Sequence, residues 1–220
     1  YYLAQMGYYP TVFEKNEKPG GMLTYGIPSY KLEKNVIDAE IDIMREMGVE
    51  IKCGVEVGKD ITIDQLRAEG YKAFYVAIGC QGGKIPNVVG SDAEGVTTAV
   101  DFLKVANCGG YAVKGKTIVV GGGNVAIDAA RVSVRSGAKE VAMYCLETRD
   151  IMPASNEEIA EAQEDGVAIN CGWGPKEVVV ENGKAVAVVF KKCLSVFDEN
   201  NRFNPVYDEK ETQTVACDNV

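Results

Sequence analysis

Histidine is absent from this chain of 220 residues, and its absence narrows the chemistry that the chain can perform. Histidine is the side chain that most often serves as a general base and as a metal ligand. Acid–base hydrolysis is therefore disfavoured. A reaction such as hydride transfer, which depends on positioning more than on a proton relay, is favoured.

Basic residues and long apolar runs are also in short supply. The chain has 23 Lys and Arg against 32 Asp and Glu, a net charge of −9. A nucleic-acid-binding surface needs a basic stripe to neutralise phosphates, so we expect no nucleic-acid partner. No apolar run approaches the roughly 18 residues of a membrane-spanning helix, and no signal-peptide region is present, so we expect no membrane span.

Cysteines closely spaced in the sequence are missing as well, although the chain contains seven cysteines. The number is odd, and no two of them are spaced as Cys-x-x-Cys. This pattern disfavours a disulfide framework, a zinc site and an iron–sulfur cluster within the chain. We therefore expect buried, reduced cysteines in a cytoplasmic protein and no bound metal.

The most informative segment that is present runs from residue 117 to residue 131. Thr117 to Val120 is a short apolar run typical of a buried parallel strand, and a helical pattern follows three glycines directly. In this context Gly-x-Gly-x-x-Ala predicts a dinucleotide site, with phosphates at the N-terminus of the helix. A glycine-rich turn in another kind of α/β domain is the alternative. The predicted contact residues are Gly121, Gly122, Gly123, Asn124, Val125 and Ala126.

The rest of the chain alternates between strand and helix patterns, which predicts an α/β protein with two Rossmann-like, three-layer nucleotide-binding units, at 1–100 and 101–220. The expected helices cover residues 31–47, 63–68, 98–106, 124–136 and 155–166, and the expected strands cover 11–15, 49–53, 73–78, 117–120, 140–146 and 167–171. Beyond residue 171 two apolar strands flank Asn182-Gly183, a favoured type I′ turn, which predicts an antiparallel β-ribbon added to the second unit.

Both ends of the chain have the pattern of interrupted elements. The first residues read as the end of a helix that stops at Gly7, and residues 214–220 read as the start of a strand. We therefore expect an internal fragment of a longer polypeptide. A complete small protein with frayed ends is the alternative.

Three further features of the first unit are consistent with a nucleotide site. Glu14 ends a strand where such folds place a carboxylate against ribose hydroxyls, although a solvated surface residue has the same pattern. The adjacent pair Gly20-Gly21 allows close approach of the backbone to a ligand. Pro28 then stiffens the chain, although an ordinary loop accounts for these residues equally well.

Taken in order, these segments resemble a known family. The ordered motifs are Glu14-Lys15, Gly20-Gly21-x-Leu23, Tyr25-Gly26-Ile27-Pro28, Gly48-Val49-Glu50-Ile51, Val57-Gly58-Lys59-Asp60-Ile61, Ala77-Ile78-Gly79, Gly121-Gly122-Gly123-Asn124-x-Ala126-x-Asp128 and Met152-Pro153-Ala154. Together they resemble the flavoprotein small subunit of glutamate synthase and the matching region of dihydropyrimidine dehydrogenase. The resemblance implies hydride transfer from NAD(P)H to FAD, with electrons passed on to iron–sulfur clusters in another domain or a partner subunit.

The resemblance also assigns residues to FAD, which makes residues 1–100 a partial FAD-binding domain. It implies that Glu14 binds the ribose, that Gly21, Met22, Leu23 and Ile27 lie near the flavin, that Val57 contacts adenine, and that Ala77 and Gly79 lie on the pyrophosphate side. The family's first glycine loop would precede Tyr1. Residues 1–220 alone are therefore expected to bind FAD weakly or not at all, and to be inactive by themselves.

For residues 101–220, an NAD(P)H-binding domain, the resemblance raises the choice of nicotinamide cofactor. Family members that use NADPH carry an arginine pair where this chain has Cys145 and Leu146. Glu147 follows where Rossmann folds place the carboxylate that binds a free ribose 2′-hydroxyl, and Arg149 remains nearby. We expect NADH to be favoured over NADPH. An NADPH-dependent glutamate synthase small subunit and a non-catalytic nucleotide-binding or scaffold module are the alternatives.

Overall fold

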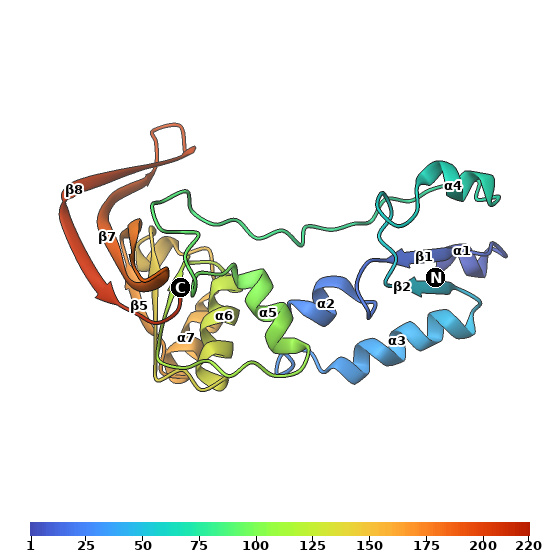
Figure 1. The fold of residues 1–220 in the computed structure, drawn as a ribbon, viewed down its shortest axis with the longest axis horizontal. Helices are drawn as coiled ribbons and strands as arrows, with labels where there is room; N and C mark the ends of the chain where they lie inside the picture. Colours follow the sequence, from blue (N-terminus) through green and yellow to red (C-terminus); the bar gives the residue numbers. More distant parts are fainter. The chain divides into compact units, whose positions relative to one another are not determined.

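The computed structural model describes all 220 residues, which divide into two compact units, Tyr1–Gln81 and Gly82–Val220 (Figure 1). This division lies before residue 100, the predicted boundary between the FAD and NAD(P)H domains. Which cofactor each unit holds stays a prediction. Parallel sheets with helices and an added antiparallel sheet confirm the predicted α/β class.

The first unit is built around two parallel strands. Its elements are α1 (Tyr2–Gln5), β1 (Thr11–Glu14), α2 (Gly21–Tyr25), α3 (Lys34–Glu46), β2 (Glu50–Cys53) and α4 (Ile63–Ala68). Strands β1 and β2 pair in register from Thr11 opposite Glu50 to Glu14 opposite Cys53. Helix α3 connects them and buries Ile37 on its apolar face. Glu14 therefore stands at the carboxyl end of its strand, as predicted from the sequence.

The strand expected at residues 73–78 does not form, and this prediction was wrong. These residues have no regular secondary structure, and Tyr75 and Ile78 are 91% and 81% exposed. A run of β-branched and aromatic residues becomes a strand only when it finds a neighbouring strand and a surface to cover. The sheet of this unit contains β1 and β2 only, so the run stays unpaired.

The second unit contains two sheets. Its elements are α5 (Ala99–Asn107), β3 (Lys116–Val120), α6 (Asn124–Arg135), β4 (Glu140–Cys145), the 3₁₀ turn η1 (Arg149–Ile151), α7 (Asn156–Glu164), β5 (Ala168–Cys171), β6 (Trp173–Glu181), β7 (Lys184–Phe197) and β8 (Phe203–Ala216). Strands β3, β4 and β5 are parallel and adjacent in that order, and β6, β7 and β8 form an antiparallel sheet.

Consecutive residues of β4 show how the three layers pack. Met143 is fully buried with Ile127 of α6 and Ile159 of α7 in the core on the helix side of the sheet. Tyr144 points to the opposite face, where its ring stacks on Phe190 of β7 with centroids 4.1 Å apart. Side chains alternate across a strand, so one parallel sheet separates a helical layer from an antiparallel sheet.

The hairpin between β6 and β7 has the predicted turn. Asn182 and Gly183 have φ of 51° and 82°, the left-handed pair that a type I′ turn requires. Glu181 pairs with Lys184 across this turn. The predicted ribbon is confirmed.

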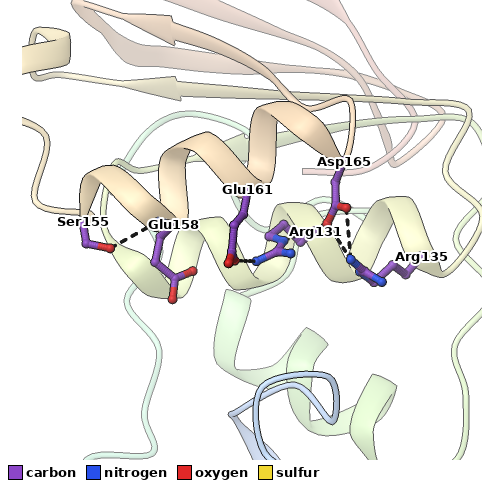
Figure 2. Close-up of polar contacts among 6 residues, drawn as sticks. All are labelled: Arg131, Arg135, Ser155, Glu158, Glu161 and Asp165. Atoms are coloured by element: carbon purple, nitrogen blue, oxygen red, sulfur yellow. Dashed lines mark hydrogen bonds and ion pairs between the residues drawn. The ribbon is translucent and has the colours of Figure 1, made fainter.

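Helices α6 and α7 are joined by a network of ion pairs (Figure 2). The Arg131 side chain is only 7% exposed, and its Nε lies 2.7 Å from Asp165 Oδ2. Arg131 also pairs with Glu161, and Arg135 donates to both oxygens of Asp165. Partial burial raises the pKa of Asp165, but hydrogen bonds and charge from the two arginines outweigh it and hold that pKa below the ordinary value of 3.8.

No helix in the chain combines the length and the apolar character needed to cross a lipid bilayer.

Candidate dinucleotide-binding site

The site begins where β3 ends in the glycine loop, residues 121–123. Gly121 has φ of 140°, a conformation that side chains rarely adopt, and its N–H donates to the Tyr144 carbonyl at 2.8 Å. A Cβ placed on Gly121 would lie 3.4 Å from the Cβ of Ala126. Small residues at both positions therefore let the first turn of α6 approach the end of β3.

The other two glycines differ in what surrounds them. A Cβ on Gly122 would lie 2.9 Å from Glu147 Oε2 and 3.0 Å from Cys145 Cβ, so this glycine packs closely on the end of β4. A Cβ on Gly123 would meet nothing within 4 Å. The backbone at Gly123 is thus open on the side where a ligand could approach.

Helix α6 presents its N-terminus at this open position. Gly123 is its N-cap residue, and no side chain caps the helix. The first N–H groups and the positive end of the helix dipole can therefore stabilise an anion. Asn124 and Val125, at the start of the helix, are exposed. A helix of twelve residues behind an uncapped glycine loop fits the pyrophosphate of a dinucleotide.

The loop before α7 is tied to the glycine loop by two hydrogen bonds. The Ala154 N–H donates to the Gly122 carbonyl at 3.0 Å, and the Ser155 N–H donates to Asn124 Oδ1 at 3.1 Å. The predicted ligand residue Asn124 therefore also positions a neighbouring loop. Sequence reasoning missed this tie, because nothing in the local pattern relates Asn124 to Ser155.

Glu147 lies beside the glycine loop, as its carboxylate contact with Gly122 shows. Its carbonyl accepts the Gly172 N–H at 2.9 Å, which anchors the turn after β4. Arg149 is exposed and donates to Asn156 Oδ1 at 3.1 Å. Glu147 is thus held close to the predicted phosphate site, whereas Arg149 is drawn toward the start of α7.

A cation that the sequence analysis missed lies beside Gly172, the residue whose N–H donates to the Glu147 carbonyl. Lys192 of β7 has its Nζ 4.8 Å from the centroid of the Trp173 ring and 3.4 Å from a Cβ placed on Gly172. Lys192 is remote from Glu147 in the sequence, so no local signal could have linked the two.

In the first unit, Glu14 is held by a neighbour rather than left in solvent. Its Oε1 accepts from the Asn16 N–H at 2.8 Å and from Asn16 Nδ2 at 2.7 Å. Asn16 Nδ2 also donates to Gln81 Oε1 at 3.4 Å, and Gln81 Nε2 lies 3.9 Å from a Cβ placed on Gly21. The structure therefore brings Glu14 and Gly21 together through two residues that the sequence analysis did not single out. A carboxylate fixed in this way suits a ribose hydroxyl.

The residues predicted near the flavin follow Gly21 in α2 and the turn after it. Leu23 and Ile27 are linked by Lys34, whose Nζ donates to both of their carbonyls. Met22 packs closely on Gly26, where an added Cβ would lie 2.2 Å from the methionine methyl group. Lys34 was not predicted as part of this region.

The remaining predicted FAD contacts are more dispersed. Val57 is 41% exposed and forms an isolated bridge with Ile61. Ala77 and Gly79 lie in the exposed segment that fails to form a strand.

Several characterised proteins are similar in sequence. No protein-family model matches the chain. The glutamate synthase [NADPH] small chain of Halomonas elongata is 35% identical over 99% of this chain and 48% of its own length. The NAD-dependent dihydropyrimidine dehydrogenase subunit PreT of Escherichia coli O157:H7 is 41% identical over 86% and 44%, respectively. The NADPH-Fe(3+) oxidoreductase subunit beta of Geobacter sulfurreducens is 35% identical over 100% and 34%.

Solved structures share the fold. FprA of Mycobacterium tuberculosis in complex with NADPH has a TM-score of 0.78 at 16% identity, over 95% of this chain and 62% of FprA. The T. acidophilum thioredoxin reductase has a TM-score of 0.67 at 18% identity, over 99% and 69%. The chain therefore shares the fold of this class of oxidoreductases.

Within that class the sequence relationship is more specific. Over the part that it spans, the chain is homologous to the glutamate synthase small chains and the PreT subunits, which confirms the resemblance carried by its motifs. It spans about half the length of these relatives.

Proposed function

We propose that this chain is part of an NAD(P)H-dependent flavoprotein oxidoreductase. The glycine loop carries the proposal, because its open Gly123 backbone and the uncapped N-terminus of α6 suit a pyrophosphate. The relatives include an NAD-dependent dehydrogenase subunit and NADPH-linked enzymes, which supports the same reaction class.

FAD is the proposed acceptor, held in part by the first unit. When bound, the flavin supplies the acceptor for the hydride of the nicotinamide. Glu14, fixed by Asn16, would accept a hydrogen bond from the FAD ribose. The segment that contains Leu23 and Ile27, tied by Lys34, would line the flavin. The role of this chain would be to bind and orient the two cofactors. Electrons would then pass from the flavin to an iron–sulfur domain or a partner subunit.

We infer further that NADH is the preferred nicotinamide cofactor. The Glu147 carboxylate stands against Gly122, close to where a dinucleotide bound on the glycine loop would place its adenosine ribose. A carboxylate there can accept a hydrogen bond from a free 2′-hydroxyl but repels a 2′-phosphate. Two neighbouring anions in a partly desolvated site cost a few kcal/mol, a discrimination of roughly a hundredfold.

Binding of the two reduced cofactors to wild type and to Glu147→Ala tests this inference. Wild type is expected to bind NADH roughly a hundredfold more tightly than NADPH, and Glu147→Ala is expected to remove most of that difference by improving NADPH binding. Glu164→Ala, which removes an exposed carboxylate at the end of α7, is the charge-matched control and should behave as wild type. Equal affinities in wild type would refute the preference.

The NADPH-dependent glutamate synthase small subunit remains the second candidate. Lys192, beside the Gly172 backbone that anchors Glu147, is the observation that favours it, because an ammonium at this position could reach a 2′-phosphate. Loss of NADPH binding in Lys192→Met, with NADH binding retained, would support this candidate. Flavin bound to the purified full-length protein would distinguish either enzyme from a non-catalytic nucleotide-binding module.

A further inference from the structure

Three sulfur atoms meet behind the glycine loop, on the helix side of the parallel sheet. Cys145 and Cys171 are register partners on the adjacent strands β4 and β5, and their Sγ atoms lie 3.8 Å apart. Met152, in the segment between η1 and α7, places its Sδ 3.7 Å from Cys171 Sγ. The three sulfur atoms lie in the core of the second unit, and none of them takes part in the proposed function.

Two of the sulfur–sulfur separations are close to those between ligands of one metal ion. For metal–sulfur bonds of about 2.3 Å, sulfur ligands lie about 3.8 Å apart in a tetrahedral site and about 4.0 Å apart in a trigonal one. The Cys145–Cys171 separation of 3.8 Å matches the tetrahedral value, and the Cys171–Met152 separation of 3.7 Å is slightly shorter. We propose that Cys145, Cys171 and Met152 form a binding site for a soft, thiophilic metal ion of the Cu(I) class.

The donor set selects the metal. Two thiolates and a thioether are soft ligands, which favour Cu(I), whereas hard cations require oxygen donors. Binding replaces the two thiol protons, which pass to solvent, and no electron is transferred. Cys145 is 2% exposed, Met152 is 8% exposed and Cys171 is partly buried, so the ion would lie among apolar core side chains.

A metal ion bound at this site would directly affect the neighbouring dinucleotide site. The Cys145 Sγ lies 3.4 Å from a Cβ placed on Gly122, and 3.7 Å from the Glu147 carbonyl oxygen. Drawing Cys145 and Cys171 onto a metal would therefore shift the backbone that supports the glycine loop. We expect bound Cu(I) to weaken NADH binding. This consequence rests on the proposed function, whereas the metal site itself does not.

The test is an anaerobic titration with Cu(I) in competition with a chromogenic Cu(I) chelator. The full chain carries Cys80→Ser and Cys108→Ser as a background, because these two exposed thiols would bind Cu(I) unspecifically. This background protein is expected to remove one equivalent of Cu(I) from the chelator. Adding Cys145→Ser or Cys171→Ser should abolish that competition, and Met152→Leu should weaken it.

Cys217→Ser is the matched control. Cys217 is also buried and has a raised pKa, about 11, because of that burial, but it belongs to the core on the opposite face of the sheet. Its removal should leave Cu(I) binding unchanged. X-ray absorption at the copper edge of the loaded background protein needs no further variant and should show three sulfur ligands.

Two results would overturn the metal site. One is a background protein that fails to compete for Cu(I), and the other is competition that survives Cys145→Ser. NADH affinity measured with and without Cu(I) separates the two proposals. If the metal-free protein binds no NADH, the proposed function fails while the titration still decides the metal site.

Discussion

Substitution by alanine should affect two neighbouring glycines of the glycine loop differently, lowering thermal stability at Gly122 and NADH affinity at Gly123. In Gly122→Ala the new Cβ would lie 3.0 Å from Cys145 Cβ, an atom fixed to the backbone of β4. Glu147 Oε2, at 2.9 Å, is the end of a flexible side chain and can move away. The clash with Cys145 therefore has to be relieved by a shift of the loop or the strand.

The expected cost of Gly122→Ala follows from this overpacking. Inserting a methyl group into a closely packed core costs about 1–3 kcal/mol of the free energy of unfolding. For a chain of this length each kcal/mol lowers the melting temperature by about 2–4 °C. Thermal unfolding followed by circular dichroism should therefore show a clear decrease in melting temperature.

Gly123→Ala is the matched variant one residue further along the chain. Gly123 has φ of −94° and ψ of 172°, which any residue adopts, and its new Cβ would meet nothing within 4 Å. Its melting temperature should equal that of wild type. Its methyl group would occupy the space where the pyrophosphate approaches the backbone, so we expect NADH binding to weaken at least about tenfold, or about 1.4 kcal/mol.

Either variant can refute the reasoning. Unchanged NADH affinity in Gly123→Ala would mean that the phosphates do not pack on this backbone. An unchanged melting temperature in Gly122→Ala would mean that the glycine loop and β4 are not closely packed at this position.

Asp165→Asn is expected to lower the free energy of unfolding by about 1–3 kcal/mol, because the buried Arg131 and its neighbour Arg135 lose their shared carboxylate. Since the folded-state pKa of Asp165 is lowered, its ionisation stabilises the fold above the ordinary value of 3.8, and this contribution is lost as pH falls through the folded pKa. In urea unfolding, the difference in free energy of unfolding between wild type and Asp165→Asn should become smaller below pH 3.8. A difference that does not change with pH would contradict this. Gly183→Ala should cost about 1–2 kcal/mol through backbone strain alone, because φ is 82° and the new Cβ meets no neighbour. Gly82→Ala, equally open but without positive φ, should be neutral, and equal melting temperatures for the two variants would exclude strain as the cause.

Local features of the sequence were sufficient where a short segment specifies its own backbone. The apolar run before Gly121 predicted β3, and the helix pattern after the glycines predicted α6 to within one residue. Asn182-Gly183 predicted the hairpin turn, because few residue pairs tolerate two consecutive left-handed conformations. Thr98 was predicted to open α5, and its hydroxyl accepts the Asp101 N–H at 3.1 Å.

Long-range features depended on partners that no local pattern names. Residues 73–78 have the composition of a buried strand, but strand formation requires a neighbouring strand, and the first unit offers none to this segment. Arg131 reads as a surface residue of an amphipathic helix. It is buried only because α7 brings Glu161 and Asp165 against it.

The sequence by itself determined the class of this protein, because a strand, a glycine loop and a helix are encoded in fifteen consecutive residues and need no other part of the chain to be recognised. The tertiary structure decided which side chains surround that loop. Asn124 accepts a hydrogen bond from Ser155, the Glu147 side chain packs beside Gly122, and Cys145 is the register partner of Cys171. These contacts form because parallel strands from distant parts of the sequence end at one edge of the sheet. Their proximity arises from strand order and register, which the spacing of residues along the chain does not contain.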